Sequence, residues 1–181
     1  NTAYKFALIA IGDSNNADSI ASTLSSAVTT NKSYTISYNT NGSTGGSAPT
    51  NGSWITGASA SNISQNSGTL VRSGYTFAGW NTAANGGGTD YAATGSATYS
   101  TAADLTLYAK WTANGLTITY DANFTGGTTV TETKTADTAF NLRSNTFTRT
   151  GYTFAGWATS SSGTVSKVDA ASATLLADTT Y

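Results

Sequence analysis

Nine residues that occur twice, as RSGYTFAGW at 72–80 and as RTGYTFAGW at 149–157, decide how this chain folds. Within each copy the Tyr and the Phe stand two residues apart, so they point to one face of a β-strand while the Thr between them points to the other. The Trp falls outside this period unless the preceding Gly forms a β-bulge, which is a common use of glycine in strands. We therefore expect a strand with a bulge in each copy, at Gly79 and at Gly156.

The blocks that flank these two strands show that the repeated unit is larger. YTISYN at 34–39 and ADLTL at 103–107 surround the first copy, whereas LTITYD at 116–121 and ADTTY at 177–181 surround the second. The same blocks in the same order indicate one fold used twice, and units of this size can each own a small core. The sequence thus predicts an N-terminal segment (1–33), a first repeat domain (34–111), a linker (112–115) and a second repeat domain (116–181).

The composition points to a mainly β protein whose surface is polar but weakly charged. Charged residues make up 9% of the 181 residues, whereas an average soluble protein has roughly 25%. The chain has 36 Thr and 23 Ser residues, which supply polar surface in place of charge. Because Thr, Val, Ile and Tyr are abundant and Glu132 is the single glutamate, helix propensity is poor and strand propensity is good.

The same composition argues against several kinds of function. His and Cys are absent, so the chain can form no Ser-His-Asp triad, no zinc site of the usual ligands and no disulfide. Its eight Lys and Arg residues are scattered, unlike the basic stripe that binds nucleic acid. The longest apolar run, 6–11, is far shorter than the roughly 20 residues that span a bilayer. We expect no enzyme, cofactor, metal, nucleic-acid partner or membrane insertion.

The first 33 residues belong to neither repeat. Residues 4–11 are almost wholly apolar, which is typical of a strand that is buried between layers. Further along, Ile20, Leu24 and Val28 are spaced as on one side of a helix. The segment is therefore predicted to be a strand followed by a short helix.

The order of GYTFAGW, a Gly-rich loop and ADLTLYAKW at 103–111 is similar to the internalin-type B repeat, a module of bacterial surface proteins with a compact β-grasp fold. The resemblance covers about residues 34–181. It implies two tandem β-grasp-like repeat domains, which the N-terminal strand and short helix precede. It also implies an extracellular or cell-surface location, a stalk, adhesive or partner-binding role, and no catalytic site.

The second copy departs from the first at its end, because YAKW at 108–111 has no counterpart after Tyr181. A sheet without this strand exposes an apolar groove and unpaired backbone groups. We hypothesise that the N-terminal strand of another copy fills the groove and that such head-to-tail contacts build a filament. The predicted acceptor edge consists of Leu175, Leu176 and Tyr181. The predicted plugs are Tyr4, Phe6, Leu8 and Ala10 or, on the other face, Ala7, Ile9 and Ile11.

Two alternatives to strand donation stay open at this point. Either the polypeptide continues beyond Tyr181 and closes its own sheet, or residues 4–11 pack onto the first repeat of their own chain.

The tryptophans give a second functional hypothesis. Trp80, Trp111 and Trp157 belong to repeated strand blocks and are predicted to lie in the core, whereas Trp54 lies in a stretch that the second copy lacks. Trp54 is therefore the candidate for contact with a glycan or a host protein. The sequence predicts a non-enzymatic extracellular protein that forms a surface filament or adhesin stalk, with a surface binding module as the alternative.

Overall fold

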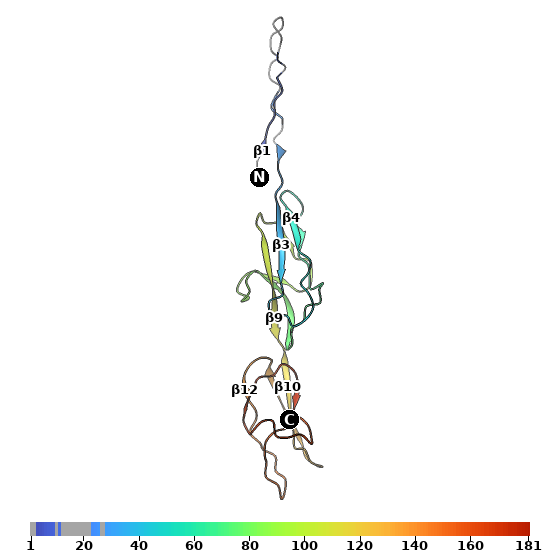
Figure 1. The fold of residues 1–181 in the computed structure, drawn as a ribbon, viewed down its shortest axis with the longest axis vertical. Helices are drawn as coiled ribbons and strands as arrows, with labels where there is room; N and C mark the ends of the chain where they lie inside the picture. The colour runs from blue at the N-terminus through green and yellow to red at the C-terminus, as the bar shows by residue number, and fades with distance from the viewer. Residues whose placement is uncertain (1–2, 10, 12–22, 26–27) are drawn as a thin grey trace. The chain divides into compact units, whose positions relative to one another are not determined.

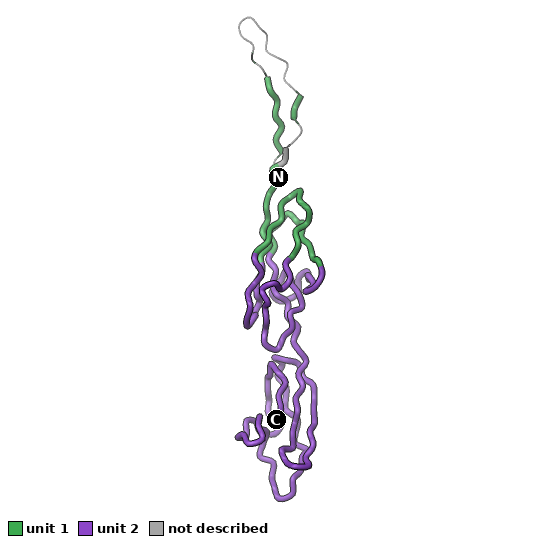
Figure 2. The backbone as a smooth tube through the Cα atoms, turned by 90° about the vertical axis from the view of Figure 1, so that its right-hand side faces the viewer, with its two compact units in different colours: residues 1–37, 51–63, 96–105 green, residues 38–50, 64–95, 106–181 purple. Residues whose placement is uncertain are grey.

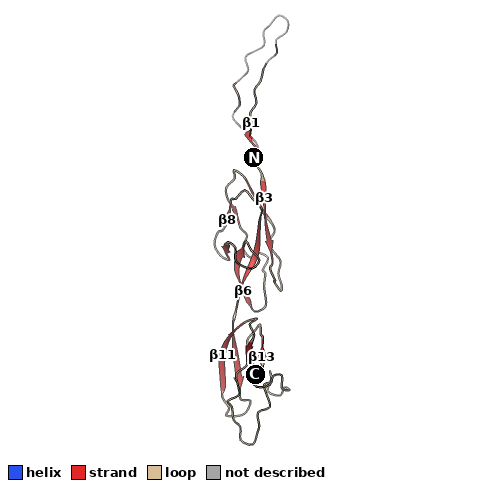
Figure 3. Ribbon diagram, turned by 90° about the vertical axis from the view of Figure 1, so that its left-hand side faces the viewer, coloured by secondary structure: helices blue, strands red, loops and turns tan. Residues whose placement is uncertain are grey.

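The structure is a computed structural model and describes residues 3–9, 11, 23–25 and 28–181. Every regular element in these residues is a β-strand, and none of them forms a helix (Figure 3). The mainly β class that was expected from the abundance of Thr, Val, Ile and Tyr is confirmed.

The chain folds into two compact units (Figure 2). The first unit contains residues 1–37, 51–63 and 96–105, and the second contains residues 38–50, 64–95 and 106–181. The first repeat contributes to both units, whereas the second repeat lies entirely in the second unit.

A five-stranded sheet forms the first repeat, in the spatial order β4-β3-β9-β6-β7. Figure 1 labels β3, β4 and β9 of this sheet. Its strands are β3 (Ser33–Asn39), β4 (Gly52–Ile55), β6 (Tyr75–Asn81), β7 (Asp90–Ala92) and β9 (Leu105–Ala113). A separate antiparallel pair joins β5 (Ser61–Asn62) to β8 (Thr98–Tyr99).

The first copy of the repeated stretch forms β6, which lies antiparallel to β9 with Phe77 opposite Trp111. The register shifts between Phe77 and Gly79, so the bulge predicted at Gly79 is confirmed. Gly79 has a φ of 125°, and a Cβ added there would lie 2.3 Å from the carbonyl oxygen of Tyr91. Only glycine fits this backbone, and the bulge places Trp80 in the core, as predicted.

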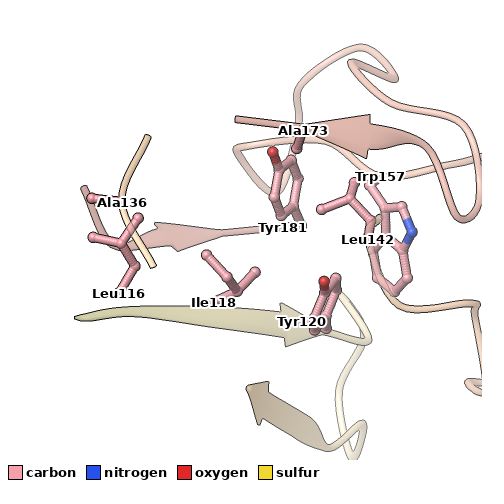
Figure 4. Packing of buried hydrophobic residues seen from close by; sticks show 8 residues of the cluster. All are labelled: Leu116, Ile118, Tyr120, Ala136, Leu142, Trp157, Ala173 and Tyr181. Atoms are coloured by element: carbon pink, nitrogen blue, oxygen red, sulfur yellow. The ribbon is translucent and has the colours of Figure 1, made fainter. Parts of the chain in front are cut away.

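The second repeat is built around β10 (Gly115–Asp121), which lies between β11 (Thr129–Thr135) and β14 (Thr179–Thr180). β11 pairs with β10 in the antiparallel sense and β14 in the parallel sense. β12 (Phe140–Asn141) and β13 (Ser172–Ala173) form a separate antiparallel pair. Ile118 and Tyr120 are fully buried, as their alternation along β10 predicts, and they share one apolar core with Trp157 and Tyr181 (Figure 4).

In each repeat, an aspartate at the equivalent position accepts a hydrogen bond from the first strand. The backbone N–H of Thr35 donates to Asp104 Oδ1 at 2.8 Å, and the N–H of Thr117 donates to Asp178 Oδ1 at 2.8 Å. Because these bonds join equivalent positions, β14 occupies the place in the second repeat that the start of β9 occupies in the first.

The N-terminal segment differs from the prediction in two ways. β1 (Ala3–Tyr4) pairs with β2 (Val28–Thr29), so Val28 belongs to a strand, and Leu24 lies in irregular structure. The predicted helix is therefore wrong in its described part, because Ser and Thr are weak helix formers and Ala3–Tyr4 offers a strand partner. Ile20 lies outside the described residues. The expected burial is also absent from this chain, since Leu8 is 82% exposed and Ile11 86% exposed.

Candidate functional site

An open groove of about 680 Å³ runs along one edge of the second repeat. Its walls come from the turn at 121–124, the segments 145–149 and 152–161, and the chain end at 180–181. The aromatic side chains that line it are Phe124, Phe147, Tyr152, Phe154, Trp157 and Tyr181. A groove of this size, lined by aromatic rings among polar side chains, is large enough to take several side chains.

The groove lies where β9 lies in the first repeat. There, residues 108–113 of β9 pair with β6 along its length, from Asn81 to Tyr75. Residues 152–156 are the second copy of β6, yet they form no strand, and the only β-bridge of this segment joins Trp157 to Lys167. In the first repeat the corresponding cavity shrinks to about 180 Å³, because β9 itself supplies one wall.

The backbone edge that faces the groove has no strand partner in the described part of the chain. Tyr152 N–H bonds to Arg149 within a turn, and Trp157 N–H bonds to Lys167, but no strand pairs with residues 153–156. Unpaired N–H and C=O groups along an extended segment are a template for a further strand.

The second feature of the groove is the side-chain amide of Asn123, which has the same local geometry as Asn41 in the first repeat. In the first repeat Asn41 has a φ of 46°, and its side-chain amide donates to Ala84 O at 2.9 Å and to Ala109 O of β9 at 2.8 Å. Asn123 has a φ of 53° and donates to Ser161 O at 2.9 Å, which is the counterpart of the bond to Ala84. A side-chain amide carries two N–H donors, so Asn123 has a second donor for a strand in the groove.

Aromatic rings form the floor of the groove. The ring centroid of Trp157 lies 4.8 Å from that of Tyr120 and 4.9 Å from that of Phe154 (Figure 4 shows Trp157, Tyr120 and Tyr181). The first repeat has the same cluster, but there β9 covers it. The ring centroid of Trp111 in β9 lies 5.6 Å from that of Phe77. Phe154, the counterpart of Phe77, is exposed instead.

The indole nitrogens of Trp80 and its counterpart Trp157 differ in their hydrogen bonding. Trp80 Nε1 donates to Ser64 O at 2.9 Å. Trp157 Nε1 is buried and has no hydrogen-bond partner within the described residues. An unpaired buried donor costs about 1–3 kcal/mol. Hydrogen bonding around Trp157 in the second repeat is therefore less complete than around Trp80 in the first.

Charge plays a small part in the site. Below the groove, Tyr120 donates its hydroxyl to Glu132 Oε1 at 2.6 Å and accepts the N–H of Arg143 at 3.0 Å. Burial and the bond to Glu132 together raise the pKa of Tyr120 to about 12, and burial also raises the pKa of Tyr181. No group of three metal-ligating side chains occurs among the described residues. The arrangement offers backbone edges and apolar surface rather than acid–base chemistry.

The structure separates the three residues of the predicted acceptor edge. Tyr181 lines the groove and is buried against Tyr120. Leu175 packs against the core, and Leu176 contacts the turn at Gly74. Only Tyr181 is therefore a groove residue.

The other predicted site residues lie outside the second repeat. Trp54 lies in β4 with 9% of its surface exposed, and it stacks on Tyr34 with centroids 6.2 Å apart. Among the predicted plugs, the exposed side chains are Tyr4, Phe6, Ala7, Leu8, Ile9 and Ile11, and Ala10 lies outside the described residues.

Sequence reasoning missed Asn123, Phe124, Phe147 and Phe154 as groove residues. The signal for two of them was present, because Asn123 and Phe154 align with Asn41 and Phe77, which contact β9 in the first repeat. Phe124 replaces Gly42, so no repeat pattern pointed to it. Phe147 aligns with Leu70, which is buried in the first repeat, so the repeat pattern indicated a core residue there.

Comparison with known proteins identifies the repeats. A family model described as the Listeria-Bacteroides repeat domain matches residues 34–110 and again residues 117–180. A protein of Evansella cellulosilytica, described as a Gly-rich membrane protein, is 36% identical over 102 residues. That alignment covers 53% of this chain but only 12% of the relative.

No solved structure matches the chain. The described residues contain no helix with the length and hydropathy to cross a membrane.

Proposed function

The chain belongs to the Listeria-Bacteroides repeat domain family, and from this premise we propose that it is a non-enzymatic, surface-associated repeat protein that assembles by binding a β-strand in the groove of its second repeat. The internalin-type B repeat is a narrower assignment than the family match provides. The surface location is supported by the family and by the name of the Evansella relative.

The observation that carries the proposal is the correspondence between the groove and β9. The first repeat shows what a strand does at this place: it pairs with β6, covers Phe77 with Trp111 and accepts a bond from Asn41. The second repeat offers the same edge, ring and amide at residues 152–157 and 123. Burial of each Leu- or Phe-sized side chain contributes about 1.5–3 kcal/mol, so a strand with two or three apolar residues would bind firmly.

We propose that the occupant is the N-terminal segment of a second copy. Residues 3–9 and 11 present apolar side chains to water, of which Phe6 is 66% exposed and Leu8 82% exposed. An extended strand rises about 3.3 Å per residue, so nine residues are long enough to match the groove-facing part of β9. One chain would thus carry both a donor and an acceptor, and the contact between copies would be heterologous and would build a filament.

The donor segment is paired in the chain that carries it, through β1 and β2 and through two bonds between Phe6 and Ser25. Phe6 N–H donates to Ser25 Oγ at 3.0 Å, and Ser25 N–H donates to Phe6 O at 2.9 Å. Strand insertion replaces these backbone bonds with bonds to residues 153–156, so the net gain on transfer is the burial of the exposed apolar side chains, about 1.5–3 kcal/mol for each one that is fully buried.

Deletion of residues 1–12 tests the proposal. We expect the full chain to form fibres that electron microscopy shows and the deletion variant to sediment as a monomer. Addition of a synthetic peptide of residues 3–11 should saturate the groove of the variant. Polymers that persist after the deletion would contradict donation by this segment, and failure of the peptide to bind would favour closure of the groove by the chain's own continuation.

Two point variants identify which face of the strand enters the groove. Leu8→Asp and Ile9→Asp place one carboxylate on opposite faces of the same strand. We expect one of them to abolish assembly and the other to leave it nearly unchanged, because only one face is buried. Equal effects would contradict insertion as a β-strand.

Recognition of a glycan or host protein through Trp54 stays the alternative. The burial of Trp54 against Tyr34 gives it no support.

A further inference from the structure

The first repeat contacts the second through the turn at residues 72–75. Tyr75 donates its hydroxyl to Asp137 Oδ2 at 2.7 Å, and Arg72 Nη2 lies 3.8 Å from the same oxygen. A Cβ added to Gly74 would lie 3.0 Å from Leu176 Cδ2 and 3.2 Å from Ala136 Cβ. We call Ala136, Asp137 and Leu176 the leading edge of the second repeat.

The turn at residues 149–152 has the same geometry. Tyr152 N–H bonds to Arg149 O at 3.0 Å, as Tyr75 N–H bonds to Arg72 O. The guanidinium carbon lies 3.8 Å from the tyrosine ring centroid in both turns. The φ angles of Gly74 and Gly151 are 77° and 78°. The second turn therefore holds its side chains in the arrangement that the first uses for contact.

The environments of the two turns differ. A Cβ on Gly151 would meet no atom within 4 Å, and Tyr152 is 67% exposed. Arg149 makes no ion pair with any residue that the structure describes, although it lies near the ring of Phe124. A guanidinium that stacks on a tyrosine ring, next to the hydroxyl of that ring, is preorganised to bind a carboxylate.

We propose that the turn at residues 149–152 is a docking surface for the leading edge of a further repeat, one that presents an aspartate in the position of Asp137. The contact between turn 72–75 and Asp137 is the precedent, and the positive Arg149 complements the carboxylate. This goes beyond strand insertion, because a strand can fill the groove without a carboxylate at the turn.

The partner is not the first repeat of an identical copy. Thr56 N–H bonds to Lys32 O at 3.0 Å in the first repeat, as Ala136 N–H bonds to Asn114 O at 2.9 Å in the second. The position of Asp137 is therefore taken by Gly57, and both residues have positive φ angles, 57° and 85°. The first repeat lacks the carboxylate, so the turn selects a repeat that has one.

A longer chain tests this directly. Residues 108–181 are appended after Tyr181, so that the chain gains a third repeat with its own copy of Asp137. We expect Tyr152→Phe to lower the folded-to-unfolded ratio of the longer chain by about fivefold, the size of one hydrogen bond, and to leave the 181-residue chain unchanged. Tyr75→Phe is the positive control and should lower the ratio in both chains. An effect of Tyr75→Phe without an effect of Tyr152→Phe in the longer chain overturns the proposal.

A second measurement needs no added repeat. Gly57→Asp gives the first repeat the missing carboxylate, and a Cβ there would meet only Asn31 Oδ1, at 3.6 Å. Wild-type protein with 13C-labelled tyrosine is titrated with unlabelled Gly57→Asp protein, and Gly57→Asn protein is the neutral control. We expect the Tyr152 signal to shift with the Asp protein alone and the shift to shrink in high salt.

Equal shifts with the Asp and Asn proteins, or none, overturn the proposal. Tyr152 lines the groove as well as the turn, so both proteins in this titration lack residues 1–12. Strand insertion by that segment then makes no contribution to the Tyr152 signal, and the two proposals are distinguished.

Discussion

At the scale of single residues, Asn41 and Asn123 show how one side chain serves two purposes. Both have positive φ angles, which Asn tolerates better than most residues, and both close the turn after the first strand of their repeat. Asn41 donates its second amide hydrogen to Ala109 O of β9. Asn123 donates one amide hydrogen to Ser161 O, which leaves its second for a strand in the groove. Under the proposed strand insertion, the same residue type is structural in the first repeat and binds the inserted strand in the second.

Asn123→Asp should weaken strand binding without unfolding the repeat. The variant keeps the size of the side chain and its tolerance of positive φ but loses both amide donors. We expect the affinity of protein lacking residues 1–12 for the 3–11 peptide to fall by about 2- to 12-fold, which corresponds to about 0.5–1.5 kcal/mol. Calorimetric titration measures this. Asn41→Asp is the matched control and should leave peptide affinity unchanged, so an equal loss in both variants would contradict the assignment.

Tyr120→Phe should change how stability depends on pH. Burial and the bond to Glu132 raise the pKa of Tyr120 to about 12, so its contribution is present below pH 10 and is lost as the pH rises from about 10 to 12. The Phe variant lacks this contribution at every pH. We expect it to be less stable at neutral pH by about 1.5–3 kcal/mol, and the difference from wild type to narrow above pH 10 in urea unfolding. A constant difference across this range would contradict the role of the hydroxyl.

At the scale of elements, the repeat pattern predicted the strands well and the N-terminal segment poorly. The alternation of Ile118 and Tyr120 and the bulge at Gly79 could be read from the sequence, because strand periodicity and glycine placement are local properties. At Gly156 the φ is 141°, but no strand of the described residues pairs with residues 153–156, so the register shift that marks a bulge at Gly79 has no counterpart there. The helix over Leu24 and Val28 failed, because its spacing competed with a strand partner at Ala3–Tyr4.

The groove could be predicted only in outline. Of the three residues predicted for the acceptor edge, the structure places Tyr181 in the groove. Leu175 and Leu176 do not line the groove, because the chain turns between them and β14. The side on which a residue lies after a turn depends on tertiary packing, which no local pattern reports.

Gly79→Ala, compared with Gly86→Ala, should distinguish the cost of a steric clash from the cost of a positive φ angle. The new Cβ would clash with Tyr91 O in a backbone conformation that L residues avoid, so we expect a loss of about 1–3 kcal/mol or more in the stability of the first repeat. Gly86→Ala is the matched control, since its φ is 77° and no atom lies within 4 Å of its Cβ. We expect it to cost only about 1–2 kcal/mol. Chemical denaturation measures both, and a larger loss at Gly86 would contradict the packing at the bulge.

At the scale of the whole molecule, the described residues carry two complementary features. The second repeat has an open groove of about 680 Å³ whose edge at residues 153–156 has no strand partner among the described residues, and residues 3–9 and 11 carry exposed apolar side chains. Exposed apolar surface of this kind marks sites of interaction. A family of tandem repeats supplies the context in which such surfaces join repeats and copies.

Hydrogen exchange of the backbone amides at residues 153–156 tests strand insertion most directly, because it requires no assumption about register. In assembled wild-type protein we predict that some of these amides become protected, that protection grows with protein concentration, and that it disappears in the variant lacking residues 1–12. Protection that is the same at all concentrations and survives the deletion would contradict insertion of a strand from another copy.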